Sequence, residues 1–200
     1  MNKIIDGKKI SKKRLLSLQE KIKKLSTEPS LAFILIGDHP PSRTYVKMKK
    51  KACEQVGITS QVLEFPFSIE EKTLLEEIDR LNKDMSVDGI LLQLPLPKQI
   101  SIDKVFMEID PMKDVDGFHP LNMGSLVLGK PLFIPCTPLG IKNLLTEENI
   151  PVEGKHLVIV GRSQIVGKPL ACLFIQKDQR ANALALFFRL IPRITLVSRG

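Results

Sequence analysis

Tyr45 and Lys49 are residues whose types and spacing could act together on one ligand. They lie four positions apart in a segment predicted to be helical, so both side chains project from the same face of the helix. A lysine amine can pass protons to and from a reacting molecule, and an aromatic ring can form a wall beside it. The alternative is that Lys49 belongs to a solvated run of lysines at residues 47–51.

Gln93 is a second candidate because of its place after an apolar run. Residues 90–92 are Ile-Leu-Leu, and Leu94 and Pro95 follow Gln93. This order predicts that Gln93 lies near the carboxyl end of a buried parallel strand, where open α/β sheets bind their ligands. The alternative interpretation is a polar residue that only ends the strand.

Two carboxylates lie close together in the sequence Asp-Val-Asp-Gly-Phe at residues 114–118. One interpretation is a structural Asx-type turn in which Gly117 adopts a positive φ. A metal would need more ligands than Asp114 and Asp116, and no His or Glu cluster completes a set. We therefore predict no metal site, and we expect His119 to be structural.

A glycine turn follows the apolar run at residues 156–160. Gly161 and Gly167 lie six positions apart, which differs from the spacing of the G-x-G-x-x-G dinucleotide motif, so an ordinary strand-to-helix turn remains an alternative. The helix that Val166 and Gly167 open would offer backbone N–H groups and a positive dipole end to a pyrophosphate or a ribose oxygen.

Alternating helices and strands are predicted to position these residues. Hydrophobic periodicity predicts helices at residues 11–26, 41–56 and 69–83 and strands at residues 31–36, 58–65 and 89–94. The residues predicted to face inward are Leu15, Leu18, Ile22 and Leu25, then Tyr45, Met48, Ala52 and Val56, then Leu74, Leu75, Ile78 and Leu81. This alternation implies an α/β fold with a parallel sheet and helices on both faces.

The later part of the chain is predicted to begin with loops. Residues 95–138 are rich in proline and should be loop-rich, as functional segments often are. A helix is predicted at residues 137–148, with Thr137 as its N-cap and Pro138 at its first position. A new strand-turn-helix unit should begin at residues 155–160.

Composition narrows the class of protein. The 200 residues, 43% of them hydrophobic, can bury a substantial core. The sequence contains neither an apolar stretch of about 18 residues nor a signal-peptide pattern, so we expect a soluble cytoplasmic protein without membrane contact. The three cysteines are far apart in the sequence, which favours reduced and mostly buried thiols over disulfides or zinc ligands.

The net charge of +8 raises nucleic-acid binding as a minor hypothesis. The lysines gather on amphipathic segments such as residues 12–24, as a solvated helix face would place them, and aromatic residues do not alternate with them. Phosphates or an acidic tail on a small substrate would explain the charge equally well. We therefore predict no nucleic-acid partner.

Five motifs, taken in order, resemble the bifunctional methylenetetrahydrofolate dehydrogenase/cyclohydrolase family, and the similarity spans residues 2–177. The motifs are Ser42-Arg43-Thr44-Tyr45-Val46-x-x-Lys49, Gly89-Ile90-x-x-Gln93-Leu94-Pro95-Leu96-Pro97, Asp114-Val115-Asp116-Gly117-Phe118, Pro135-Cys136-Thr137-Pro138-x-Gly140 and Gly161-Arg162-Ser163-x-x-Val166-Gly167-Lys168-Pro169. Together they are far more specific than any one of them.

The resemblance implies an enzyme of one-carbon folate metabolism. Its reactions would be hydride transfer from 5,10-methylenetetrahydrofolate to NADP and hydrolysis of the methenyl product to 10-formyltetrahydrofolate. The fold would be an N-terminal parallel-sheet folate domain at residues 1–150 and a Rossmann-like NADP-binding domain at residues 151–200. The resemblance also implies a homodimer.

The resemblance also assigns roles to residues. Lys49 would be the key catalytic group, Tyr45 would orient the folate, Gln93 would contact Lys49, and Asp116 would hydrogen-bond the pterin ring. The remaining residues expected to bind the substrate are Leu94, Pro95, Cys136 and Thr137. The residues expected to bind the cofactor are Gly161, Arg162, Ser163, Val166, Gly167, Ser198 and Arg199.

The end of the chain departs from the family pattern. Residues 178–193 intrude before a second strand predicted at residues 194–197, and the apolar run at residues 183–188 is interpreted as an aberrant or core-seeking segment. Ser198 and Arg199 follow that predicted strand where an acidic residue would select NAD, so these two residues and Arg162 favour NADP. The second domain is therefore expected to be truncated, and the alternative hypothesis is a catalytically impaired fragment that binds folate or another subunit.

Overall fold

The computed structural model describes residues 4–176 with their side chains and residues 182–186 as backbone. Its residues form two compact units. The N-terminal unit comprises Asp6–Val115, and the C-terminal unit begins at Asp116 and also includes Ile4 and Ile5. The predicted division at residue 150 concerns ligand binding and stays a prediction.

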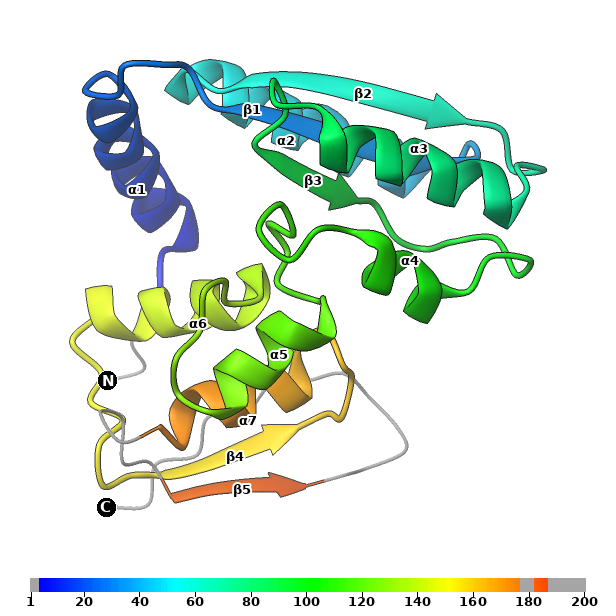
Figure 1. The fold of residues 1–200 in the computed structure, drawn as a ribbon. Helices are drawn as coiled ribbons and strands as arrows, with labels where there is room; N and C mark the ends of the chain where they lie inside the picture. The colour runs from blue at the N-terminus through cyan, green and yellow to red at the C-terminus, as the bar shows by residue number, and fades with distance from the viewer. Residues whose placement is uncertain (1–3, 177–181, 187–200) are drawn as a thin grey trace. The chain divides into compact units, whose positions relative to one another are not determined.

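The N-terminal unit contains a parallel three-stranded sheet in the order β2-β1-β3 (Figure 1). Its strands are β1 (Ser30–Ile36), β2 (Thr59–Phe65) and β3 (Gly89–Leu92), and its helices are α1 (Gly7–Ile22), α2 (Pro40–Val56), α3 (Glu71–Lys83) and α4 (Ile102–Glu108). The predicted α/β class and the parallel sheet are confirmed.

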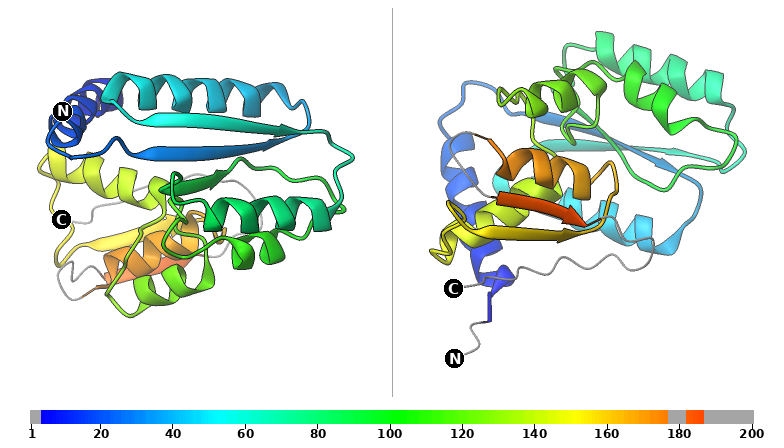
Figure 2. Two further views of the ribbon diagram at one scale, coloured as in Figure 1. Left: turned by 45° about the horizontal axis from the view of Figure 1, so that its top comes forward. Right: turned by 90° about the horizontal axis from the view of Figure 1, so that it is seen from below.

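Helices α2 and α3 cover opposite faces of this sheet (Figure 2). Phe33 and Leu35 of β1 pack with Val46 and Cys53 of α2. Because side chains alternate along a strand, Ile34 points to the other face, which α3 covers. The fully buried residues of α3 are Leu74, Ile78 and Leu81. The central strand β1 and its neighbour β3 are therefore buried on both sides, as their almost continuous apolar sequences require, whereas the edge strand β2 is partly exposed.

The predicted inward stripe of α2 is only partly right: Val56 is buried as predicted, but the first half of the stripe is not. Tyr45 and Met48 are 59% and 63% exposed, whereas Val46 and Cys53 are buried. The buried face of the helix includes a polar residue, Ser42, which is only 4% exposed. A prediction that follows apolar residues alone cannot find a stripe that contains a buried hydroxyl.

The prediction for helix α1 is also only partly right, since Ile22 is buried as predicted. Leu18 and Leu25 are 40% and 55% exposed, and Ile10 and Ile22 are the buried residues. Helix α1 lies against α2 through only part of its surface. Its outward face carries exposed lysines such as Lys12, as predicted for a solvated face.

Two short helices interrupt the region predicted to be loop-rich. Helix α4 begins after Ser101, whose Oγ accepts a hydrogen bond from the Lys104 amide at 3.4 Å. Helix α5 (Pro120–Val127) begins after His119, whose Nδ1 accepts one from the Leu121 amide at 3.0 Å. Proline in the first turn of α5 costs no backbone hydrogen bond, so Pro120 starts this helix instead of preventing it. His119 is structural, as expected.

The C-terminal unit combines α5, α6 (Cys136–Glu147) and α7 (Gly167–Phe174) with the strands β4 (His156–Val160) and β5 (Asn182–Leu186). The two strands pair in parallel. The buried core residues of this unit are Leu145, Leu157, Ile159, Leu170 and Phe174. A β-α-β unit of this kind is the start of a Rossmann-like fold.

Strand β5 falls inside the apolar run that was interpreted as an aberrant or core-seeking segment. The run supplies the backbone that pairs with β4, with Leu157 opposite Ala183 and Val160 opposite Leu186. A short continuous apolar run is the usual pattern of a buried parallel strand. The strand predicted at residues 194–197 lies outside the described residues.

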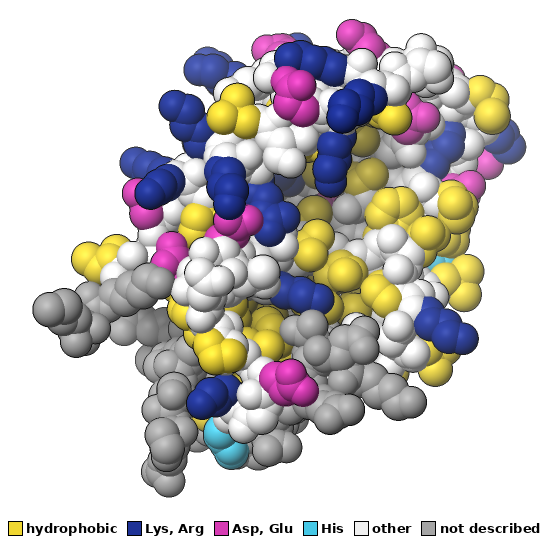
Figure 3. Space-filling model, turned by 90° about the vertical axis from the view of Figure 1, so that its left-hand side faces the viewer, with side chains coloured by type: hydrophobic (Ala, Val, Ile, Leu, Met, Phe, Trp, Pro, Cys, Tyr) yellow, Lys and Arg dark blue, Asp and Glu magenta, His cyan; other side chains and the backbone are white. Residues whose placement is uncertain are grey.

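The surface of the described ranges carries mixed charge. Figure 3 shows Lys and Arg side chains spread over one face, with Asp and Glu side chains among them.

Within residues 4–176 and 182–186, no helix combines the length and the apolar character needed to cross a membrane.

Asn82 and Lys113 attach the C-terminal end of α3 to the segment that leads towards Asp114. Asn82 donates through Nδ2 to the Glu108 carbonyl at 2.7 Å and accepts through Oδ1 from the Asp110 amide at 2.9 Å. Lys113 Nζ donates to the Leu81 and Asp84 carbonyls at 2.9 and 2.7 Å. These contacts satisfy helix-end carbonyls and hold the approach to the acidic turn.

We expect Asn82→Ala to lower the free energy of unfolding by about 1–3 kcal/mol, because two backbone groups lose their partner. Lys83→Ala on the same helix is the matched control, since its exposed ion pair with Asp79 contributes at most about 0.5 kcal/mol. Urea denaturation followed by circular dichroism measures both. Equal losses in the two variants would contradict the role of Asn82.

Candidate active site

The candidate site of the N-terminal unit lies where β1 and β3 end. Strand β1 is central, and β3 pairs with it in parallel. The backbone N–H of Gln93 donates to the Ile34 carbonyl at 2.9 Å. After β1 the chain turns through Gly37, which has a φ of 75°, and enters α2. Because α2 and α3 lie on opposite faces, the order of the strands reverses at β1, and such a point is where α/β sheets bind ligands.

Lys49 and Gln93 meet at this point. The Lys49 Nζ donates to Gln93 Oε1 at 3.3 Å, and both side chains are half-buried. Gln93 is held from its other side, because its Nε2 donates to the Leu94 carbonyl at 2.9 Å. The structure therefore brings together two residues that are 44 positions apart, and it places the amine of Lys49 beside an uncharged partner.

Tyr45 lies one helical turn before Lys49 on α2, and its ring is mostly exposed. Leu94 is half-buried and Pro95 is exposed, and the peptide bond between them is cis. Tyr45, Leu94 and Pro95 are thus accessible around the Lys49–Gln93 pair. Their predicted roles in substrate binding stay predictions.

Ser42 is a member of this site that was not assigned a role from the sequence. Its side chain is buried, its Oγ donates to the Leu94 carbonyl at 3.2 Å, and His39 Nδ1 lies 3.0 Å from the same Oγ. The available signal was its spacing: Ser42 is three positions before Tyr45 and seven before Lys49, so it shares their helix face.

Arg43 fixes the beginning of α2 to the ends of β1 and β2. Its guanidinium hydrogen-bonds the Asp38 carboxylate and lies 3.0 Å from Glu64. The hydrogen bond that Arg43 donates to Asp38, followed by the charges of Asp38 and Glu64, raises the pKa of Arg43. The first turn of α2, which carries Ser42, is thereby anchored beside the sheet.

The acidic turn spans the boundary between the two units. Asp114 is buried, and its backbone forms a parallel bridge with Ile90 of β3. Asp116 is half-buried and begins the C-terminal unit. Gly117 has a φ of 69°, as predicted, and an added Cβ there would lie 3.1 Å from the Pro135 backbone nitrogen. The turn that carries Asp116 therefore meets the segment just before Cys136.

Cys136 and Thr137 lie in the first turn of α6, and both are exposed. The N-cap of α6 is Pro135, so the prediction of Thr137 as N-cap is wrong by two positions. Cys136 also departs from the expectation of buried cysteines. Burial raises the pKa of the Cys53 and Cys172 thiols, which favours their uncharged forms.

The glycine turn between β4 and α7 brings two backbone segments very close. Gly161 has a φ of 150°, and a Cβ added to Gly167 would lie 2.5 Å from the Gly161 carbonyl oxygen. Ser163 Oγ accepts hydrogen bonds from the Val166 and Gly167 amides at 3.1 and 3.3 Å. Both glycines are therefore required by this turn, although their spacing differs from the common motif.

Ser163 changes what the start of α7 can offer an anion. Its hydroxyl already engages the amides of Val166 and Gly167, so a phosphate must displace it or bind other donors. Arg162 and Lys168 are exposed cations in the same turn. The other two residues predicted to bind the cofactor, Ser198 and Arg199, lie outside the described residues.

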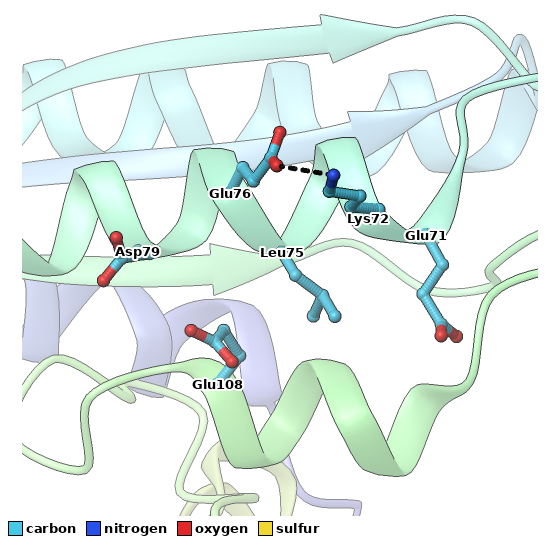
Figure 4. Close-up of a pocket in the computed structure, with 6 residues that line it drawn as sticks. All are labelled: Glu71, Lys72, Leu75, Glu76, Asp79 and Glu108. Carbon is cyan, nitrogen blue, oxygen red and sulfur yellow. Dashed lines mark ion pairs between the residues drawn. The ribbon is translucent and has the colours of Figure 1, made fainter.

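A separate shallow hollow of about 400 Å³ lies between α3 and α4 (Figure 4). It is lined by Glu71, Lys72, Leu75, Glu76, Asp79 and Glu108 and contains none of the predicted site residues. Lys104 and the Ser101 amide hydrogen-bond the Glu71 carboxylate and lower its pKa, so this contact between α3 and α4 weakens as pH falls through that lowered pKa.

Among the described residues, no group of His, Cys, Asp and Glu could hold a metal ion.

Comparison with known proteins identifies the family. The sequence model of the family described as tetrahydrofolate dehydrogenase/cyclohydrolase, catalytic domain, matches residues 5–116. The chain belongs to the tetrahydrofolate dehydrogenase/cyclohydrolase family. The model of the NAD(P)-binding domain of this tetrahydrofolate dehydrogenase/cyclohydrolase family matches residues 135–187, so it includes β4, α7 and β5.

Relatives within the tetrahydrofolate dehydrogenase/cyclohydrolase family are longer than this chain. The bifunctional protein FolD of Bacillus cytotoxicus is 51% identical over 178 residues, which are 88% of this chain and 62% of that protein. The bifunctional FolD structure from Campylobacter jejuni has a TM-score of 0.89 and 45% identity, covering 94% of this chain and 67% of that chain. This chain thus spans about 62% of the length of the curated relatives it matches.

A further relative is a FolD structure from Trypanosoma brucei that is described as complexed with NADP cofactor and inhibitor. It has a TM-score of 0.86 and 30% identity, and the match covers 92% of this chain and 64% of that chain.

We expect Gly167→Ala to lower the free energy of unfolding by about 2 kcal/mol, because the new methyl group would collide with the Gly161 backbone. Hydrogen exchange measured by mass spectrometry should increase at residues 156–174 and not at residues 30–92. Gly124→Ala is the matched control, since a Cβ there meets nothing within 4 Å, and it should raise helix stability by about 0.5 kcal/mol. Unchanged exchange in Gly167→Ala would refute the close approach.

Proposed function

We propose that this chain hydrolyses 5,10-methenyltetrahydrofolate to 10-formyltetrahydrofolate and, with NADP, oxidises 5,10-methylenetetrahydrofolate to the methenyl form. Membership of the tetrahydrofolate dehydrogenase/cyclohydrolase family supports both reactions. The observation that carries the proposal is the contact of Lys49 Nζ with Gln93 Oε1 at the point where the order of the strands reverses.

The hydrolysis needs a group that moves protons. Water adds to the carbon of the methenyl bridge and loses one proton, which leaves a hydroxyl on that carbon. The bond from the carbon to one ring nitrogen then breaks, the nitrogen takes up a proton, and the hydroxyl loses its proton to become the formyl C=O, so one proton is released overall. The Lys49 amine can accept the first proton and return one to the leaving nitrogen. Gln93 holds this amine through a neutral amide oxygen, which places no second charge at the site.

The other site residues are proposed to bind the folate. Tyr45 would pack against it from α2, and Asp116 would accept hydrogen bonds from the amide-and-amine edge of the pterin. Leu94 and Pro95 would contact the same ligand, and so would Cys136 and Thr137. In this proposal residues 1–150 bind the folate and residues 151–200 contribute to NADP binding.

The turn between β4 and α7 suits a dinucleotide. Gly161 leaves open space where a Cβ would stand, Gly167 lets α7 begin close to the Gly161 backbone, and Arg162 supplies an exposed positive charge for a phosphate. NADP, when bound, accepts the hydride. The Arg162 side chain and the Ser163 backbone would hold it, the Val166 and Gly167 amides would do so once the cofactor displaces the Ser163 hydroxyl, and Ser198 and Arg199 remain predicted contributors. The NADP complex of the Trypanosoma brucei relative supports this choice of cofactor.

We expect Lys49→Met to reduce methenyltetrahydrofolate hydrolysis by about a hundredfold or more, because methionine fills the space but moves no proton. Folate binding should remain mostly intact. Turnover is followed by loss of methenyltetrahydrofolate absorbance, and binding by isothermal titration calorimetry. Lys51→Met on the same helix is the matched control, since Lys51 is exposed and should leave turnover unchanged.

Unchanged hydrolysis in Lys49→Met would remove Lys49 from the mechanism. Hydrolysis by the wild-type chain without NADP reduction would restrict the proposal to the cyclohydrolase reaction. Folate binding with neither reaction would instead favour the catalytically impaired, folate-binding fragment.

We expect Arg162→Ser to raise the KM for NADP by about tenfold and to leave the KM for NAD unchanged, because the extra phosphate of NADP loses a charged partner. Steady-state dehydrogenase kinetics with each cofactor measure this difference. Lys155→Ser, at an exposed position before β4, is the matched control. An equal loss for both cofactors would contradict a selective role for Arg162.

The homodimer implied by the family resemblance and the cytoplasmic location expected from the sequence are both proposals. Size-exclusion chromatography with light scattering measures the first directly. Cell fractionation measures the second.

A further inference from the structure

Four side chains and one carbonyl form a continuous hydrogen-bonded path that ends at Lys49. His39 Nδ1 lies 3.0 Å from Ser42 Oγ, and Ser42 Oγ donates to the Leu94 carbonyl at 3.2 Å. Gln93 Nε2 donates to the same carbonyl at 2.9 Å, and its Oε1 accepts from Lys49 Nζ at 3.3 Å. The path therefore links the residue before α2 to the proposed catalytic amine.

Proton counting decides the direction of the first contact. The Ser42 hydroxyl has one proton, which it donates to Leu94, so towards His39 it can only accept. His39 Nδ1 must then carry a hydrogen and donate it. A nitrogen that only accepted would compete with the Leu94 carbonyl for the Ser42 proton.

The Leu94 carbonyl determines which way the Gln93 amide faces. An amide has a donor end and an acceptor end of nearly equal shape, and the donor end is held on Leu94. That leaves the acceptor, Oε1, directed at Lys49. If Leu94 moved, the amide could rotate and offer its NH2 group to the amine, which would lose the contact.

We propose that His39 is a positioning residue for Lys49: its Nδ1–H holds Ser42, Ser42 holds the Leu94 carbonyl, and that carbonyl holds the Gln93 amide towards the amine. This inference rests on the proposed cyclohydrolase function. The contact is not a helix cap, because the His39 side chain makes no capping hydrogen bond although the residue is the N-cap of α2.

Three substitutions of His39 in the 200-residue chain separate positioning from capping. His39→Asn keeps a donor near the place of Nδ1 and should hold kcat for hydrolysis within about twofold of wild type. His39→Ala loses the donor and should lower kcat about fivefold with little change in KM. His39→Asp is an excellent N-cap but only accepts hydrogen bonds, so it should be as impaired as His39→Ala.

A double-mutant cycle tests whether the effect passes through Ser42. Ser42→Ala should lower kcat by a similar factor, and adding His39→Ala to it should cause little further loss. A full additional fivefold loss in the double variant would overturn the path. So would recovery of kcat in His39→Asp, which would assign His39 to capping, or normal kcat in His39→Ala.

A measurement without turnover separates this inference from the proposed function. The side-chain NH2 signals of Gln93, assigned by their loss in Gln93→Met, should shift in the NMR spectrum of His39→Ala and keep their positions in His39→Asn. A wild-type chain that fails to hydrolyse methenyltetrahydrofolate defeats the proposed function, whereas the NMR shifts still report the path. Active wild type with Gln93 signals unmoved in His39→Ala defeats the positioning role.

Discussion

The parallel pairing of β1 with β3 is the constraint on which the candidate site depends. It aligns the carboxyl ends of two strands that are distant in the sequence, so that Gln93 follows β3 beside the point where β1 turns towards α2. Because β2 pairs with the other edge of β1, α2 and α3 take opposite faces. Lys49 of α2 can then donate its hydrogen bond to Gln93, and neither residue could reach the other without this strand order.

Polar contacts hold this arrangement where apolar packing stops. Arg43 ties the start of α2 to Asp38 and Glu64, and buried Ser42 ties the same turn to the chain after β3. A buried hydroxyl is costly unless it is hydrogen-bonded, and here its partner is a carbonyl of the site itself. Stability and positioning therefore rest on the same contact. At the C-terminal end of α3, Asn82 and Lys113 form comparable polar contacts that hold the segment leading to the acidic turn.

In the C-terminal unit, backbone proximity has the corresponding role. Gly117 packs against the segment before Cys136, and Gly167 packs against Gly161. In both places a side chain would occupy space that the backbone already fills. Gly117 therefore lets Asp116 lie near α6, and Gly167 lets α7 lie near β4. The pair Gly161 and Gly167 achieves this without the spacing of the common dinucleotide motif.

The sequence by itself determined the α/β alternation, the family and the identity of the Lys49–Gln93 pair, because strand patterns, turn glycines and local motifs are short-range signals. Tertiary structure decided which face of α2 is buried, that short helices form among the prolines, and that the late apolar run becomes β5. It also decided the part played by Ser42. These outcomes depend on what each segment packs against, and partners distant in the sequence leave no periodic trace in it.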